Sequence, residues 1–122
     1  MNSFQKQILV VDHDPDLLRL VGEKLEGMGY DVRTARNGLE GLEVLNQSSI
    51  DGILLALLMP IMDGLQMLRR IMEKYPHIPV IMMSAVTNTG GLEQAIKDGA
   101  MEYLLKPIDN ALLSQKCRRV FD

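Results

Sequence analysis

Short apolar runs and helical apolar stripes alternate along this chain. The runs are rich in Val, Ile, Leu and Met and only a few residues long, which is typical of strands. The third and fourth are almost continuously apolar, which favours strands covered on both faces of a sheet. The predicted strands lie at 7–11 (QILVV), 30–35 (YDVRTA), within 50–60 (IDGILLALLMP), at 79–85 (PVIMMSA) and at 101–105 (MEYLL).

Each apolar run is followed by apolar residues at helical spacing. The first helix has the clearest boundaries, because Asp14 suits an N-cap, Pro15 the first helical position and Gly29 a stop. A further helix is expected to start at Asp63-Gly64. The expected stripes are Leu17, Leu18, Val21, Leu25 and Met28; Leu39, Leu42 and Leu45; Leu65, Leu68, Ile71 and Met72; Leu92, Ala95 and Ile96; and Leu112, Leu113, Cys117 and Val120.

A strand followed by a helix, five times over, predicts an α/β fold in which helices cover both faces of a parallel sheet. The connections are short and no linker interrupts the pattern, so residues 1–122 are expected to form one domain. A hydrophobic fraction of 47% is ordinary for a globular protein, and nine Met residues help to fill a core that has few aromatic side chains.

Charge and composition exclude several classes of protein. The net charge of −3 argues against a domain that binds nucleic acid by itself, which needs a basic face. A single cysteine, Cys117, excludes an internal disulfide and suits a reducing compartment. No apolar run approaches the roughly 20 residues of a membrane span, and the N-terminus has no signal-peptide pattern. We therefore expect a cytoplasmic protein.

In open parallel sheets, ligands bind beyond the carboxyl ends of the strands. Asp12, His13 and Asp14 follow the first predicted strand, Ser84 lies near the end of the fourth and Lys106 follows the fifth. Each has an ordinary explanation alone: a helix cap, a satisfied polar residue, a solvated lysine. Together, their carboxylate, hydroxyl and ammonium groups suit an oxyanion beside a divalent cation. The end of the third strand is different, because Ala56 stands where a reactive polar group would be best displayed.

The segments ILVVDHDPD, DGILLALLMPIMDG, VIMMSA and GAMEYLLKP together resemble the receiver domain of two-component response regulators, over nearly the whole chain. The resemblance implies a flavodoxin-like (βα)5 fold with strand order 2-1-3-4-5. It also implies a phosphoacceptor aspartate at the end of the third strand, phosphorylated by a histidine kinase beside Mg²⁺. The matching residue here is Ala56. Ser84 matches the switch hydroxyl, Lys106 the motif lysine and Tyr103 the switch aromatic.

The implied magnesium site is also altered. Its acidic pair matches Asp12 and His13, and its backbone ligand matches the carbonyl of Leu58. A methyl and an imidazole thus replace two carboxylates, so we expect no phosphorylation at Ala56, weak or absent Mg²⁺ binding and no other cofactor. Lys106 loses its usual partner and is expected to turn toward Asp12. Binding of a softer metal such as Zn²⁺ by His13, or phosphorylation of His13, is a minor alternative.

Several functions stay open at this stage. The chain is either a naturally degenerate receiver that signals by binding, or a competent receiver with an engineered Asp-to-Ala change. The additional departure at His13 favours the first. Expected partners are a histidine kinase or other signalling protein, or a second copy bound through the face of helix four, strand five and helix five, with Tyr103 in contact. No enzyme activity is expected. A flavin or nucleotide binder is disfavoured by the acidic DHDPD loop, and a pure dimerisation module is a third alternative.

Overall fold

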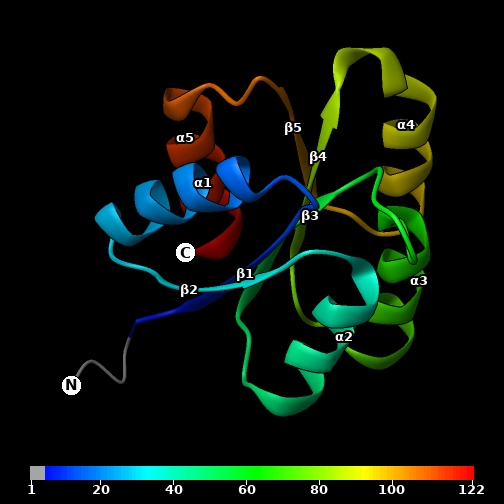
Figure 1. Ribbon diagram of the computed structural model, residues 1–122, viewed down its shortest axis with the longest axis horizontal. Coiled ribbons are helices and arrows are strands. Elements are labelled where there is room, and N and C mark those ends of the chain that lie inside the picture. The colour runs from blue at the N-terminus through cyan, green and yellow to red at the C-terminus, as the bar shows by residue number, and fades with distance from the viewer. Residues whose placement is uncertain (1–4) are drawn as a thin grey trace.

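The computed structural model describes residues 5–122 and contains a five-stranded parallel sheet between two layers of helices (Figure 1). The strand order is β2-β1-β3-β4-β5, so the predicted α/β fold and strand order are confirmed. The elements are β1 Gln7–Val11, α1 Pro15–Gly27, β2 Asp31–Ala35, α2 Gly38–Gln47, β3 Gly52–Ala56, α3 Gly64–Lys74, β4 Val80–Ala85, the short 3₁₀ helix η1 Val86–Asn88, α4 Thr89–Lys97, β5 Glu102–Lys106 and α5 Asn110–Phe121.

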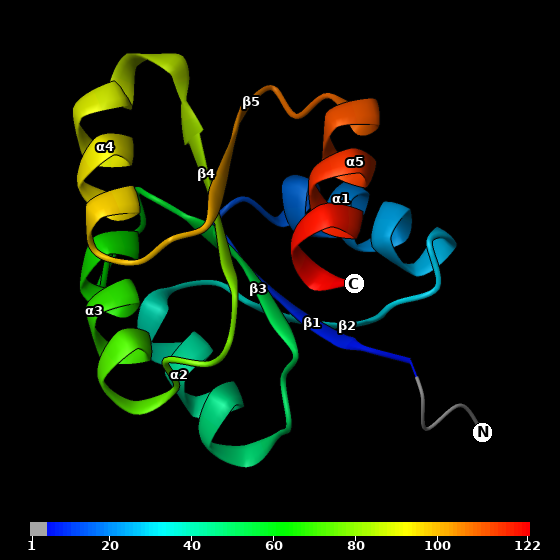
Figure 2. The same ribbon diagram turned by 180° about the vertical axis from the view of Figure 1, so that it is seen from behind.

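The two helical layers divide the core. Helices α1 and α5 cover one face of the sheet, and α2, α3 and α4 cover the other, as the views from both sides show (Figures 1 and 2). A hydrophobic cluster lies on each face of the sheet, and alternate residues of the central strands belong to one cluster or the other. Ile53 and Leu55 of β3 face the α2–α4 layer, whereas Leu54 faces α1 and α5. All five residues of β3 are buried, in agreement with a strand covered on both sides.

Most of the predicted boundaries are confirmed. Asp14 caps α1 by accepting hydrogen bonds from the backbone of Asp16 and Leu17, and Gly29 ends the segment with a φ of 99°. Helix α3 starts at Gly64 behind a capping box formed by Asp63 and Gln66. The reciprocal hydrogen bonds of this box fix the point at which the chain leaves the sheet edge after β3.

The apolar stripe predicted for α2 is wrong in part. Leu45 is buried, but Leu39 is 50% exposed. The inward face carries Gly38 and Gly41, because a Cβ at Gly38 would lie 2.8 Å from the side chain of Met62. The close approach of α2 to its neighbours therefore turns Leu39 outward.

The predictions for α4 and α5 need similar corrections. Ile96 and Leu112, expected in apolar stripes, are 42% and 43% exposed, whereas Phe121, which the pattern missed, is buried. The β2 strand, expected to have one wetter face, is largely exposed. It lies at an edge of the sheet, where α1 and α2 are its main helical neighbours.

Candidate functional site

The strand register brings the predicted site residues to one level at the carboxyl edge of the sheet. Val11 pairs with Leu55, so Asp12 lies beside Ala56. Ala56 pairs with Met83, which places Ser84 one residue further along β4. Ala85 in turn pairs with Lys106, the last residue of β5. Four neighbouring strands therefore deliver their end residues to a single place.

Asp12 and Lys106 form the central contact of this site. The Lys106 Nζ donates to Asp12 Oδ2 over 2.7 Å, as the sequence predicted. The Asp12 side chain is fully buried and that of Lys106 is 26% exposed. The ammonium thus compensates a carboxylate that has no access to solvent, which is the condition for tolerating a buried charge.

The second carboxylate oxygen of Asp12 is also occupied. Its Oδ1 accepts a hydrogen bond of 3.0 Å from the backbone N–H of Asp14, at the start of α1. His13 Nδ1 lies 3.5 Å from the same oxygen, but the His13 side chain is 55% exposed. Asp12 therefore links β1, α1 and β5, and His13 is placed at the rim.

Ala56 is fully buried at the end of β3, with its backbone against the start of α3. A Cβ on Gly64 would lie only 2.1 Å from the Ala56 carbonyl oxygen. Nearby on β4, Ser84 is 3% exposed, and its hydroxyl oxygen is buried with no hydrogen-bond partner among the described residues. A buried hydroxyl without a partner is costly, which sets Ser84 apart from an ordinary satisfied serine.

The loop between β3 and α3 covers the edge next to Ala56. Leu58 and Ile61 are 58% and 76% exposed, so the loop presents apolar side chains to solvent. Ile61 has a φ of 70°, a left-handed conformation that is unfavourable for a β-branched residue. Across the edge, the Lys106-Pro107 peptide bond is cis.

This geometry is that of a known family. A family model described as the response regulator receiver domain matches residues 8–118. The chain belongs to this family. Receiver domains of response regulators are in general signalling domains without enzyme activity.

Relatives at the level of sequence are longer than this receiver domain. The transcriptional regulatory protein GlrR of Escherichia coli K12 is 40% identical over 115 residues, which are 94% of this chain and 26% of GlrR. The DNA-binding transcriptional regulator NtrC of the same strain is 37% identical over 102 residues, 84% of this chain and 22% of NtrC. The chain spans about a quarter of the length of these relatives.

Solved structures agree with the family. The receiver domain of NtrX from Brucella abortus superposes with a TM-score of 0.88 at 31% identity, over 92% of this chain and 95% of that one. The chemotaxis protein CheY4 of Vibrio cholerae gives a TM-score of 0.89 at 26% identity, over 95% and 98% of the two chains. The flavodoxin-like arrangement predicted from the sequence is thus confirmed.

Within residues 5–122 of the receiver domain, no three His, Cys, Asp or Glu side chains gather in a way that could hold a metal ion. The site at the sheet edge consists of the buried ion pair of Asp12 and Lys106, the unpartnered hydroxyl of Ser84 and the methyl group of Ala56.

Over the same residues 5–122, no helix combines the length and the apolar character needed to cross a membrane.

A second group of polar residues lies on β5 and α5, away from this edge. Tyr103 is 39% exposed, and Lys116 Nζ lies 4.8 Å from the centroid of its ring. Lys116 also bonds Glu102, which pairs with Arg119 as well. Burial opposes ionisation of Glu102, but the hydrogen bonds from the Tyr103 N–H and Lys116, together with the two positive charges, lower its pKa below the ordinary value.

The sequence interpretation identified Tyr103 but missed the residues around it. Lys116 and Arg119 are three apart on α5, so they share one face of the helix, and that face meets the acidic Glu102. This spacing in the sequence could have predicted a basic face on α5. The pairing itself depends on how α5 lies across β5, which local sequence does not give.

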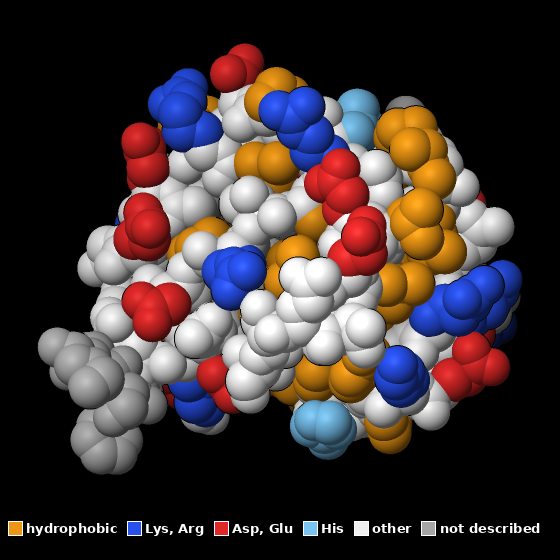
Figure 3. Space-filling model, turned by 60° about the horizontal axis from the view of Figure 1, so that its bottom comes forward, with side chains coloured by type: hydrophobic (Ala, Val, Ile, Leu, Met, Phe, Trp, Pro, Cys, Tyr) orange, Lys and Arg blue, Asp and Glu red, His pale blue; other side chains and the backbone are white. Residues whose placement is uncertain are grey.

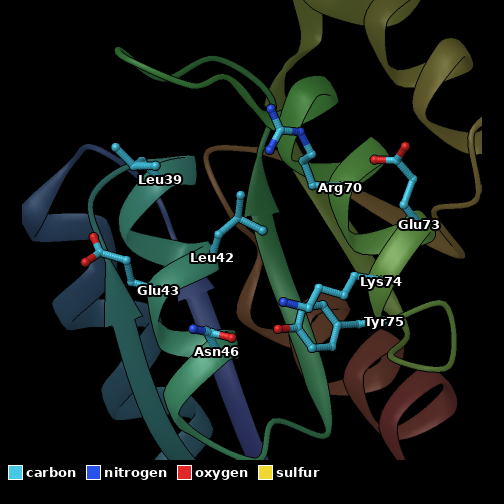
Figure 4. Close-up of a pocket in the computed structure, with 8 residues that line it drawn as sticks. All are labelled: Leu39, Leu42, Glu43, Asn46, Arg70, Glu73, Lys74 and Tyr75. Atoms are coloured by element: carbon cyan, nitrogen blue, oxygen red, sulfur yellow. The ribbon is translucent and has the colours of Figure 1, made fainter.

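Two hollows lie on the surface of the α2–α4 layer. One, of about 540 Å³, lies between α4 and β5, and Tyr103 is part of its lining. The other, of about 370 Å³, lies between α2 and α3 (Figure 4). Its lining residues are Leu39, Leu42, Glu43, Asn46, Arg70, Glu73, Lys74 and Tyr75. Neither contains Asp12, Ala56 or Ser84 in its lining, so neither belongs to the edge site.

Figure 3 shows the surface with the lower side of Figure 1 turned forward. Hydrophobic side chains gather along the right of this face, and acidic and basic side chains are interspersed over the rest. This mixture accords with the small net charge of −3.

Proposed function

We propose that this chain is a receiver domain that signals by conformational change and partner binding, without being phosphorylated at the end of β3. The observation that carries this proposal is Ala56, which lies level with Asp12, Ser84 and Lys106 and supplies only a methyl group. In this proposal Ala56 occupies the phosphoacceptor position of the family, and Ser84 and Lys106 keep the supporting positions.

The absence of a side-chain oxygen at Ala56 excludes phosphorylation at this position. Transfer of a phosphoryl group to a receiver requires a nucleophilic oxygen to attack phosphorus. The Ala56 side chain has no lone pair, and the carboxylate of Asp12 is held by Lys106 and by the Asp14 N–H. The remaining hydroxyl, on Ser84, has no adjacent base among its described contacts that would activate it. His13 lies at the exposed rim and not at the end of β3. The pocket therefore retains its outline without an oxygen that could accept the phosphoryl group.

The donor set does not fit Mg²⁺, which prefers a near-octahedral shell of oxygen ligands. Asp12 is the one carboxylate among the candidate ligands, and both of its oxygens are engaged. His13 would offer a nitrogen from an exposed position, and the Leu58 carbonyl alone does not bind the ion tightly. The Lys106 ammonium takes over the role that a metal cation has in an acidic pocket, because it neutralises the buried carboxylate of Asp12.

A receiver without a phosphoacceptor still has two states to select. A modification biases an equilibrium that already exists, and a partner that prefers one state does the same. Ser84 and Tyr103 are both present, and Tyr103 borders the hollow between α4 and β5. We propose that the face formed by α4, β5 and α5 binds a partner, either a second copy or another signalling protein, and that a histidine kinase is a further partner.

The relatives suggest what this domain controls. GlrR and NtrC are described as transcriptional regulators, and this chain corresponds to about a quarter of each. A receiver of this kind is expected to act on an output function carried by another segment or another protein. Its own net charge of −3 gives no support to direct binding of nucleic acid.

A titration with Mg²⁺ and beryllofluoride, which forms an adduct with a receiver carboxylate, tests the proposal. Amide resonances of the unmodified chain are expected to stay unchanged through millimolar Mg²⁺. The double variant His13→Asp, Ala56→Asp restores both carboxylates and is expected to show saturable shifts around β3 and β5. Saturable shifts at the same edge of the unmodified chain would refute the proposed loss of the site.

A further inference from the structure

Tyr103 lies on an edge strand between two different environments. Its strand, β5, is the outermost strand next to β4 in the described sheet, and Tyr103 itself pairs with Met82. On the α5 side, the face of the ring meets the Lys116 ammonium at 4.8 Å from the centroid. A cation at this distance over a ring face is attracted by the ring quadrupole.

Lys116 is fixed by contacts of its own. Its Nζ donates to the Tyr103 carbonyl oxygen over 2.6 Å and to Glu102 Oε1 over 3.2 Å. The same carboxylate oxygen accepts the Tyr103 N–H at 3.0 Å. The Lys116 side chain is only 18% exposed, in contrast to Arg119 on the same helix, which is 59% exposed. The ammonium is thus held at one place beneath the tyrosine ring.

Glu102 keeps this arrangement charged. Its side chain is 19% exposed and pairs with both Lys116 and Arg119. Since these bonds and charges lower its pKa, Glu102 stays ionised at neutral pH and below. Arg119 bonds Glu102, whereas the cation over the Tyr103 ring is Lys116, so the two basic residues have different relations to Tyr103.

The opposite side of Tyr103 is open. The hollow of about 540 Å³ between α4 and β5 is lined by Thr89, Leu92, Glu93, Ile96, Lys97, Tyr103 and Leu105. Ile96 and Leu105 are 42% and 39% exposed, so the walls offer apolar surface that a ring would cover. Rotation of Tyr103 about its χ1 bond away from Lys116 would bring the ring toward this apolar surface.

We propose that Lys116 is a latch that holds the Tyr103 ring on the α5 side and so keeps the hollow between α4 and β5 open. This inference rests on the proposed role of Tyr103 as the switch aromatic and adds what sets its position. Without the ammonium, the ring redistributes toward α4 and covers the apolar walls. A cation–π contact of this exposure corresponds to a change of roughly two- to fivefold in the ratio of the two ring positions.

Nuclear Overhauser contacts from the Tyr103 ring measure this ratio directly. In the variant Lys116→Met, which keeps an unbranched side chain without the charge, contacts to the methyl groups of Leu92 and Ile96 are expected to strengthen. Arg119→Gln is the matched control, because it removes a partner of Glu102 without touching the ring, and it is expected to leave these contacts unchanged. Lys116→Arg keeps a cation over the ring and is expected to restore the original pattern.

Fluorine NMR of the chain labelled with 3-fluorotyrosine gives a second readout. Tyr30 and Tyr75 serve as internal references, since Tyr75 lies beside Lys74 and not Lys116. The Tyr103 resonance is expected to move in Lys116→Met alone. The latch is overturned if Lys116→Met leaves the ring contacts as they were, or if Arg119→Gln changes them equally. No phosphate donor or metal is involved, so this result is independent of whether the edge site can be phosphorylated.

Discussion

Asp12 is a fully buried carboxylate that depends on one cation. Lys106 reaches it from β5, which is separated from β1 by β3 and β4 in the sheet, and the Asp14 N–H occupies its other oxygen. Removal of one partner of a buried pair leaves a charge without compensation, which costs more than the pair itself contributes. The stability of the edge site is therefore concentrated in this contact.

Lys106→Met is expected to lower the free energy of unfolding by about 2–3 kcal/mol at neutral pH, a value reduced from that of a fully buried pair because Lys106 is partly exposed. Urea denaturation measures this loss. Arg19→Met is the control, since the ion pairs of Arg19 are exposed and contribute little. Equal losses of unfolding free energy in Lys106→Met and Arg19→Met would contradict the stabilising role given to the Lys106–Asp12 pair.

Ile61 stores strain in the loop after β3. Its φ of 70° is unfavourable for a β-branched side chain that is 76% exposed, whereas Asn tolerates this conformation. Ile61→Asn is expected to raise the free energy of unfolding by about 0.5–1 kcal/mol, measured by thermal or chemical denaturation. Val86→Asn, which changes a similarly exposed residue without a positive φ, is expected to bring no such gain. A gain from both substitutions would show that exposed apolar surface, not strain, is the cause.

Single residues were predictable where local chemistry decides. The Asp14 cap, the Gly29 stop and the contact of Lys106 with Asp12 all follow from residue type, strand order and the cost of an unpaired charge. The unpartnered hydroxyl of Ser84 was not predictable, because it depends on the exact positions of neighbouring strands.

At the scale of elements, β3 and α3 meet so closely that only glycine fits between them. A Cβ on Gly64 would lie 2.1 Å from the Ala56 carbonyl oxygen and 2.8 Å from the Leu57 Cα. These are backbone atoms at the end of the central strand β3 and of the residue that follows it, and they cannot move without disturbing the sheet. The approach fixes the position of the loop that covers the edge site.

Gly64→Ala is expected to destabilise the fold by about 2–3 kcal/mol and to shift amide resonances around Ala56. Gly27→Ala is the matched control, because a Cβ at Gly27 in α1 meets nothing within 4 Å. That substitution is expected to stabilise the protein by up to about 1 kcal/mol, since alanine is the better helix former. Thermal denaturation of both variants gives the comparison, and a neutral effect of Gly64→Ala would refute the proposed tight contact.

Helix α2 shows why periodicity alone misjudged an element. Leucines at every third position predicted its buried face, but Gly38 and Gly41 face the core and Leu39 faces outward. Hydrophobic spacing identifies which residues prefer burial. It does not identify how closely two elements approach, and here the contact of Gly41 with Met67 sets the orientation.

At the scale of the whole molecule, the C-terminal end of α5 is bound to the segment between α1 and β2, which contains Met28 and Tyr30. The Tyr30 hydroxyl donates to Asp122 Oδ1 over 2.7 Å, and Arg118 bonds both Asp122 and the Met28 carbonyl. The buried Phe121 packs edge-to-face on Tyr30 at 6.3 Å between ring centroids. These contacts join residues about 90 positions apart, which explains why the sequence pattern did not reveal them.

The hydroxyl of Tyr30 and the thiol of Cys117 predict a loss of stability at alkaline pH. Burial, with the hydrogen bond to Asp122, raises the pKa of Tyr30 to about 12, and burial raises that of the Cys117 thiol to about 12. Both groups bind their protons more tightly in the folded state. Their contribution is therefore complete below the ordinary values of 10.0 and 9.0 and is lost as the pH rises toward 12.

Urea denaturation between pH 8 and pH 12 is expected to show this decline, with a shallower slope above the ordinary tyrosine pKa of about 10 in Tyr30→Phe. Cys117→Ala is expected to flatten the part that begins near the ordinary cysteine pKa of 9.0. An unchanged slope in both variants would show that other groups cause the alkaline loss.

The arrangement of the whole molecule was the most predictable feature. Alternating strands and helices, with strands covered on both faces, predicted a parallel sheet between helices, and the resemblance to receiver domains supplied the strand order that is observed. The carboxyl edge then follows as the site. The surface networks around Lys116 and Asp122 were not predictable, since they depend on the angle at which α5 crosses the sheet.

Intact mass spectrometry after incubation with acetyl phosphate and Mg²⁺ tests the central claim most directly. The unmodified chain is expected to keep its mass, whereas the double variant His13→Asp, Ala56→Asp is expected to gain one phosphoryl group at position 56. A phosphoryl gain on the unmodified chain, mapped by proteolysis to residues at the ends of β1, β3, β4 or β5, would contradict the account.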